Sequence, residues 1–363
     1  MKTDYKNISG EEEKEYLSDL LNTPSPSGYE RFGGIEVFKK YCRRLGLEEE
    51  FTDAMGNCVF SVGTKDSSNS IMISGHIDEI GFQVSNITKE GMINLVSLGG
   101  IDKKTLPGSI IEIIGNSGKI VRGIIGKKPI HIEYDGDERN EITKLSDTLV
   151  DIGARSKEEA EDLVSIGDTA VFERNFIPSF GEHGLMSKGL DDKVGVYITS
   201  IVMKRLKETY NNSLGSIVYG VANTQEELGL RGATVTSKRI NPKYSIDIDV
   251  TFANDEGRGI KESIYGSIEL GKGPVIEYGP DKSNAIINTM KRIAKDNNIP
   301  VQFSVSGAGG TNTDAIQLGG LNTETVHIAI PNRNMHTQVE VCDYRDIDAA
   351  IDLIYLTILE LSK

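Results

Sequence analysis

The chain has 363 residues, of which 38% are hydrophobic and 26% are charged, a composition typical of folded globular proteins with about two domains. Its formal net charge of −14 disfavours nucleic acid and anionic membrane surfaces as partners, because their negative charge would repel it. The N-terminal stretch lacks the apolar core of a signal peptide, and no run approaches the roughly 18 apolar residues of a membrane span. The three cysteines are scattered along the chain. We therefore predict a cytoplasmic protein with reduced thiols.

Helix and strand patterns alternate near the N-terminus. Ser9 followed by Glu12 has the pattern of a capping box at the start of a helix over 9–21, and a second helix is expected to end near residue 45. Strands follow over 57–63 and 70–76.

Between about residues 82 and 172 the pattern changes to short β-rich runs separated by turns, which indicates a small barrel or sandwich. The runs are GMINLVSL, SIIEIIG and KIVRGIIG. One helix is expected within this segment, because Ser156 and Glu159 repeat the capping-box pattern.

Beyond about residue 178 helices and strands alternate again. Helices are predicted over 191–210, 282–297 and 344–361, and strands over 216–223, 244–251, 301–305 and 323–330. Such alternation predicts a sheet with helices on both faces. The chain is therefore expected to form an α/β catalytic domain, residues 1–82 and 174–363, interrupted by an inserted β-rich domain over 83–173.

Ionisable residues gather where these strands and helices begin or end, and sites in open α/β sheets form at the carboxyl ends of strands. They are His76 and Asp78 in SGHIDEIGF, Asp191 and Asp192 in GLDDKVG, Glu226 and Glu227 in ANTQEELG, Asp247 and Asp249 in SIDIDVTF, and His336 in PNRNMH. Each alone has an ordinary explanation, such as a helix cap or a solvated loop. Carboxylates that converge on one site repel one another unless cations neutralise them, and histidine with carboxylates is a ligand set for zinc, cobalt or manganese.

The motifs GHIDEIGF, LDDKVG, QEELGLRGA, DVT and PNRNMH together resemble those of metallopeptidase family 42, the glutamyl and deblocking aminopeptidases that form tetrahedral TET particles. The resemblance extends from about residue 17 to about residue 361. It implies an α/β/α sandwich of the dinuclear zinc-peptidase type with an inserted small β-barrel or PDZ-like domain. It also implies a peptide hydrolase that acts on substrates with a free N-terminus, and a homo-oligomer between a dimer and a dodecamer in which the insert serves assembly and substrate access.

The same resemblance assigns roles to individual residues. It implies two divalent ions per chain, zinc or cobalt with manganese as a third candidate. One ion would be held by His76, Asp191 and Glu227, and the other by Asp191, Asp249 and His336. Glu226 would be the general base for a water held between the ions, and Asp78 would orient His76. A cis peptide bond between Asp191 and Asp192 is expected as well, and Asp247 is expected to be a neighbouring structural carboxylate.

Three other functions compete with this interpretation. Amidohydrolases and carboxypeptidases related to acetylornithine deacetylase share the ligand order, but they interrupt the catalytic domain late, whereas here the long gap lies between Asp78 and Asp191. A glycoside hydrolase needs two carboxylates about 5–9 Å apart, which adjacent glutamates match poorly, and the chain has no tryptophan for sugar stacking. A non-enzymatic assembly protein with a relic site is disfavoured because every ligand and the base are present. The side-chain preference for the substrate is left open.

Overall fold

The computed structural model describes residues 6–8, 10–65, 67–115, 118–127, 129, 131, 145, 148–210, 213–255, 266–306 and 310–363. Within these residues, eight strands form one mixed sheet in the order β1-β2-β12-β3-β13-β16-β14-β15. Their bounds are β1 Glu48–Thr52, β2 Cys58–Gly63, β3 Ser70–His76, β12 Ile217–Asn223, β13 Tyr244–Phe252, β14 Val275–Tyr278, β15 Gln302–Val305 and β16 Glu324–Asn332. The four central strands, β12, β3, β13 and β16, are parallel, so their carboxyl ends meet at one edge.

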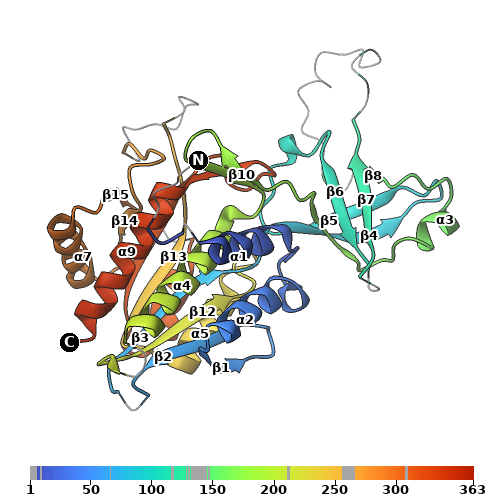
Figure 1. Cartoon of the computed structure of the whole chain (residues 1–363). Helices are drawn as coiled ribbons and strands as arrows, with labels where there is room; N and C mark the ends of the chain where they lie inside the picture. Colours follow the sequence, from blue (N-terminus) through green and yellow to red (C-terminus); the bar gives the residue numbers. More distant parts are fainter. Residues whose placement is uncertain are drawn as a thin grey trace.

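Helices cover both faces of this sheet. One face carries α1 (Glu11–Asn22), α2 (Gly34–Arg44), α4 (Leu190–Thr209), α7 (Asn284–Asn297) and α9 (Tyr344–Leu361), and the other carries α5 (Arg231–Ile240) and α8 (Asn312–Gly319). The central helix α4 packs against β3 and β13 on one side and against α1 and α9 on the other, which explains why most of its residues are buried. Figure 1 shows α4 and α9 lying across the sheet.

A closed barrel projects from this body, as Figure 1 shows. Its strands are β4 (Gly81–Ile87), β5 (Ile93–Leu98), β6 (Ile110–Ile114), β7 (Ile120–Ile125), β8 (Leu149–Asp151) and β9 (Thr169–Phe172), in the order β4-β5-β8-β7-β6-β9. The barrel has its own apolar core, in which the rings of Phe82 and Phe172 meet edge to face at 5.4 Å. Two short 3₁₀ helices, η1 (Glu30–Phe32) and η2 (Lys103–Thr105), lie in connecting loops.

A small three-stranded sheet joins the barrel exit to the C-terminal part of the chain. It consists of β10 (Ile177–Phe180), β11 (Gly184–Ser187) and β17 (Glu340–Asp343), in the order β10-β11-β17. Because β11 leads into α4 and β17 leads into α9, this sheet holds the starts of the two helices close together.

The predicted α/β fold with an inserted small barrel is confirmed. The helix α3 (Lys157–Glu161) begins as expected, with the Ser156 hydroxyl accepting a hydrogen bond from the Glu159 amide at 3.3 Å. The Glu159 carboxylate accepts from the Arg155 amide, not from that of Ser156, so only half of the expected capping box forms. Gly10 occupies the N-cap of α1, and Ser9 lies outside the described residues.

The three cysteines are free and buried, and in the described part of the chain no helix has the length and apolar character needed to cross a bilayer.

Candidate metal centre

Each of the predicted ligands is described, and each lies at the carboxyl edge of the parallel strands. His76 ends β3, Asp249 lies in β13, and Asp191 is the second residue of α4. Glu227 follows β12, and His336 lies in the loop after β16. Strand order therefore brings together side chains that are far apart in the sequence.

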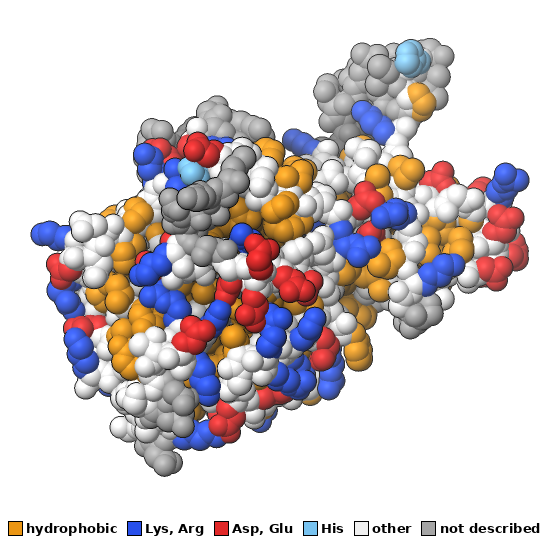
Figure 2. Space-filling view, in the orientation of Figure 1, with side chains coloured by type: hydrophobic (Ala, Val, Ile, Leu, Met, Phe, Trp, Pro, Cys, Tyr) orange, Lys and Arg blue, Asp and Glu red, His pale blue; other side chains and the backbone are white. Residues whose placement is uncertain are grey.

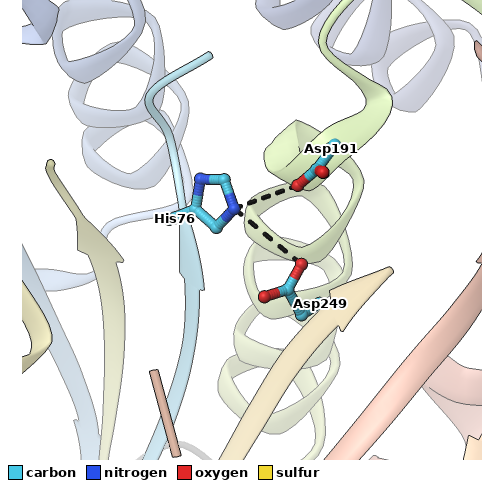
Figure 3. Close-up of side chains that lie close together, drawn as sticks. All are labelled: His76, Asp191 and Asp249. Carbon is cyan, nitrogen blue, oxygen red and sulfur yellow. Dashed lines mark hydrogen bonds and ion pairs between the residues drawn. The ribbon is translucent and has the colours of Figure 1, made fainter. Parts of the chain in front are cut away.

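The first group consists of His76, Asp191 and Asp249. The Nε2 atom of His76 lies 3.1 Å from Oδ1 of Asp191 and 3.8 Å from Oδ1 of Asp249. Figure 3 shows all three side chains converging from β3, β13 and the start of α4. All three are buried, and candidate ligand atoms of the group lie within 4.8 Å of one another.

The second group consists of Asp191, Glu227 and His336. The Nε2 atom of His336 lies 3.2 Å from Oδ2 of Asp191 and 3.3 Å from Oε1 of Glu227. Asp191 therefore belongs to both groups and uses a different oxygen in each. This is the arrangement expected of a carboxylate that bridges two cations.

The two groups that share Asp191 divide the predicted ligands differently from the division expected between the two ions. Within the two groups that share Asp191, His76 lies with Asp249 and His336 lies with Glu227, whereas His76 and Glu227 meet only in a third group that lacks Asp191. His76 and Asp249 lie on the adjacent strands β3 and β13, but β12, which leads to Glu227, also pairs with β3, so strand order alone does not set this grouping. The linear order of the motifs does not contain this information.

Glu226 lies beside the two groups, and with His76 and Glu227 it forms a third group of candidate ligands within 4.8 Å. Asp78 holds the backbone of the glutamate pair. Its Oδ1 accepts from the Glu226 amide at 3.0 Å and its Oδ2 from the Glu227 amide at 3.2 Å, while the Ser27 hydroxyl donates to Oδ2 at 2.7 Å.

Asp78 also faces His76, through both its backbone and its side chain. The Nδ1 atom of His76 lies 3.1 Å from the backbone carbonyl of Asp78 and 3.5 Å from its carboxylate. The carbonyl is the nearer partner of the histidine, and the carboxylate faces the same nitrogen while it also holds the two glutamates. The expectation that Asp78 orients His76 through its side chain stays a prediction.

Asp192 belongs to none of the candidate ligand groups. Its carboxylate accepts from the His76 amide at 3.1 Å and from the Gly195 amide at 3.0 Å. The peptide bond between Asp191 and Asp192 is cis, as predicted. Asp247 also lies outside the two groups and accepts from the Ser74 hydroxyl at 2.8 Å, which fits a structural carboxylate.

Burial raises the pKa of several carboxyl groups in the centre. The pKa rises to about 9 for Glu226, to about 8 for Glu227 and to about 7 for Asp249, and repulsion from neighbouring carboxylates adds to the effect. Burial also acts to raise the pKa of Asp191, but hydrogen bonds from His336 and His76 outweigh it and hold that pKa below its ordinary value.

The donor set fits divalent cations. The buried carboxylates lie close together and repel one another when ionised, and a bound cation would favour their ionised forms. Two imidazoles with carboxylates suit zinc, and they also suit cobalt and manganese. The non-ligating Nδ1 atoms of both histidines face backbone carbonyls, of Asp78 and of Gly100 at 2.8 Å, which leaves Nε2 of each ring free to bind a metal.

A cavity of about 430 Å³ opens beside these side chains. Apart from the ionisable groups, its lining includes Leu230, Val250 and Met335. Acidic and apolar walls thus face the same space.

One buried carboxylate near the centre was not predicted. Glu340 accepts hydrogen bonds from the backbone amides of both Asp191 and His336. In the sequence, this role could have been suspected from the position of Glu340 four residues after His336, in MHTQVE.

Comparisons with known proteins agree with this geometry. A family model described as M42 glutamyl aminopeptidase matches residues 56–353. The lysyl aminopeptidase of Pyrococcus furiosus is 32% identical over 352 residues, which cover 96% of this chain and 97% of that protein. The structure of a TET aminopeptidase from the marine sediment archaeon Thaumarchaeota archaeon SCGC AB-539-E09 has a TM-score of 0.88 at 32% identity, covering 97% of this chain and 96% of that one. The TET1 peptidase of Pyrococcus horikoshii, described as able to assemble into a tetrahedron or a large octahedral shell, has a TM-score of 0.80 at 29% identity, covering 94% and 98%.

Proposed function

The chain belongs to the M42 glutamyl aminopeptidase family and is a metal-dependent aminopeptidase, and on this premise we propose that it removes N-terminal residues from peptides at a centre of two divalent cations. The observation that carries the proposal is the position of Asp191, whose two oxygens face His76 on one side and His336 on the other.

We propose zinc or cobalt as the cations, with manganese as a third candidate. One cation would be held by His76, Asp191 and Asp249, and the other by Asp191, Glu227 and His336. The distances within each group and the shared Asp191 support this assignment.

When bound, the cations would polarise the carbonyl group of the substrate and lower the pKa of the attacking water. Glu226 takes a proton from the attacking water and returns it to the departing amine. The pairing of Glu227 with His336 supports this choice of base, because Glu227 belongs to a group that shares Asp191 and Glu226 does not. Asp78 fixes both backbone amides and so holds the two glutamates in their separate roles.

The proposed substrate is a peptide with a free N-terminus. Carboxylates around the cavity suit the positive charge of an α-ammonium group. The apolar walls at Leu230, Val250 and Met335 favour an uncharged apolar side chain on the residue that is removed.

These proposals are tested with chromogenic aminoacyl amides and their N-acetylated forms, in the presence of Zn²⁺, Co²⁺ or Mn²⁺. We expect hydrolysis of leucyl amides with a free amine, weaker hydrolysis of glutamyl amides, and none of the acetylated forms. A chelator should abolish activity and added metal should restore it. Equal cleavage of free and acetylated amides, or activity that survives the chelator, would refute the proposal.

We propose that residues 83–173 form a separate inserted domain that serves oligomerisation and substrate access. Figure 2 shows apolar side chains gathered on the barrel. Exposed apolar residues lie on its adjacent strands, namely Val96, Ile110, Ile120, Ile124 and Leu149. We expect a homo-oligomer between a dimer and a dodecamer, and Ile124→Glu should reduce the sedimentation coefficient whereas Ile124→Val should not. Unchanged sedimentation of Ile124→Glu would place the assembly surface elsewhere.

We further propose a cytoplasmic location without nucleic-acid or membrane partners. The free, buried cysteines and the net charge of −14 support it. Cell fractionation is the direct test, and recovery with the membranes would contradict it.

A further inference from the structure

Glu340 has its two carboxylate oxygens on two different segments of the metal centre. Its Oε2 accepts from the Asp191 amide at 3.0 Å, and its Oε1 accepts from the His336 amide at 3.0 Å. The residue is 1% exposed, so these hydrogen bonds are shielded from water. None of the three candidate ligand groups includes Glu340.

The fold brings Glu340 to this point in two ways. The chain turns back after β16, and two backbone hydrogen bonds of 3.0 Å between Arg333 and Val341 close a loop that contains both His336 and Glu340. In addition, β17 pairs with β11 so that Glu340 lies opposite Ser187, shortly before α4 begins. Glu340 therefore lies where the Asp191 and His336 segments meet.

Both amides need such a partner. The Asp191 amide lies at the start of α4, where Asp191 and Asp192 have non-helical backbone angles, so this N–H has no partner within the helix. His336 has a positive φ of 61°, an unusual backbone conformation that surrounding contacts must enforce. One rigid carboxylate satisfies both groups and fixes one backbone relative to the other.

We propose that Glu340 is a positioning residue of the metal centre, which holds Asp191 and His336 at the separation that one cation requires. This inference rests on the proposed dinuclear site. The side chains of Asp191 and His336 lie 3.2 Å apart while their backbones share Glu340, so a shift in either segment would change this ligand pair. The described contacts of Asp249 include an accepted hydrogen bond from the Val250 amide and none that involves Glu340, so the other cation should depend on Glu340 less.

A matched control separates positioning from general stabilisation. Asp346 is also buried, with 0% exposure, and its two oxygens accept from the amides of Gly271 at 2.7 Å and Gly273 at 2.6 Å. It thus joins two backbone groups as Glu340 does, but in a loop that carries no proposed ligand. Asp346→Asn and Glu340→Gln remove the same kind of interaction, because an amide side chain can accept through only one oxygen.

The experiment is calorimetric titration of Zn²⁺ into the metal-free, full-length protein, with circular dichroism to verify folding. We expect wild type to bind two ions, and Glu340→Gln to weaken one of the two steps by about 10- to 100-fold, the usual effect of altering a residue that orients metal ligands. Glu340→Asp, which keeps the charge but is one methylene shorter, should show a smaller loss. Excess Zn²⁺ should restore much of the kcat of both variants, whereas Asp346→Asn should keep wild-type Zn²⁺ affinity even if it unfolds more easily.

The outcomes are distinct. Unchanged Zn²⁺ affinity in Glu340→Gln, or an equal loss in Asp346→Asn, would overturn the positioning role. If Glu340→Gln fails to fold, Glu340→Asp decides in the same way. A wild-type protein that binds fewer than two ions would instead refute the dinuclear site itself.

Discussion

At the scale of single residues, the two adjacent glutamates have different surroundings. The Oε1 atom of Glu227 lies 3.3 Å from Nε2 of His336. Glu226 belongs only to the third candidate group, with His76 and Glu227, and not to either of the groups that contain Asp191. Both backbone amides are held by the single carboxylate of Asp78. Two neighbouring acids can therefore serve as a ligand and a base without exchanging roles.

Amide substitutions should distinguish these roles. Glu226→Gln keeps the side-chain shape but removes the basic group, so we expect both metals to stay bound while kcat falls by roughly 10²–10⁴-fold, the range for a lost general base. Glu227→Gln should instead weaken one metal, and added metal should restore part of its activity. Steady-state kinetics with metal analysis on both variants gives the answer. An active Glu226→Gln beside a Glu227→Gln that is inactive with full metal content would reverse the assignment.

The candidate ligands were predictable because their motifs are local. His76, Asp191 and Asp249 each stand in a short pattern at the end of a strand or the start of a helix. Their grouping was not predictable, because β3 has both β12 and β13 as neighbours and the grouping depends on where the side chains lie in the folded chain. Glu340 was missed for a related reason: its importance comes from two backbone amides that are brought together only by the folded chain.

At the scale of secondary structure, the long apolar elements were predicted and the weakly patterned ones were not. The strand β1 reads EEEFT at the sheet edge, where its charged side chains face solvent, so it lacks a hydrophobic pattern. The helix α5 reads RGATVTSKRI, in which glycine and β-branched residues lower the helix propensity. Packing of α5 against α8 and the sheet stabilises it instead.

A buried charge cluster connects the loop after β3 with the start of α4. Glu79 lies between the ammonium groups of Lys188 and Lys193, the latter at 2.7 Å, and accepts from the Ser25 amide at 2.9 Å. Burial acts to raise the pKa of Glu79, but the two lysines outweigh it and lower that pKa to about 2. Burial lowers the pKa of Lys193 to about 8 despite this pairing, because one carboxylate serves two cations.

We expect Glu79→Gln to lower the free energy of unfolding by about 3–5 kcal/mol at pH 7, because it leaves two buried ammonium groups without an anion. The pKa of Glu79 is lower in the folded than in the unfolded chain, where it is near 4.5, so its contribution is complete above that pH and is lost as the pH falls toward 2. The difference between wild type and variant should shrink over this window. Denaturant unfolding of the metal-free proteins at pH 7 and pH 3 measures it.

Glu360 provides the control for this prediction. Its carboxylate pairs with Arg292 at 2.8 Å and Lys363 at 2.6 Å, so it too has two cationic partners, but at the surface. Glu360→Gln should unfold close to wild type, because solvent screens exposed pairs. Equal unfolding free energies of Glu79→Gln and Glu360→Gln would show that the buried cluster contributes little.

At the scale of the whole molecule, the barrel and the α/β body meet at the metal centre. The loop after β5 brings Gly99 and Gly100 from the barrel to the second ligand group. The Gly100 carbonyl lies 2.8 Å from Nδ1 of His336, and a Cβ atom at Gly99 would lie 3.1 Å from Cβ of Glu227. The inserted barrel is therefore part of the centre's surroundings, whatever it contributes to assembly.

This contact makes a matched pair of glycine substitutions informative. Gly99 and Gly108 both lie in the barrel segment and both have a φ of +90°, where an L side chain is strained, but a Cβ at Gly108 would meet no atom of the described residues within 4 Å. We expect both alanine variants to lose some stability from the backbone conformation. Only Gly99→Ala should displace Glu227, and it should lower metal affinity and kcat by about tenfold or more, as changes beside a metal ligand do. Zn²⁺ titration and kinetics on the two variants compare them directly. Equal activity of Gly99→Ala and Gly108→Ala would mean that the barrel loop tolerates a side chain without moving Glu227. The barrel and the α/β body would then be independent at this point.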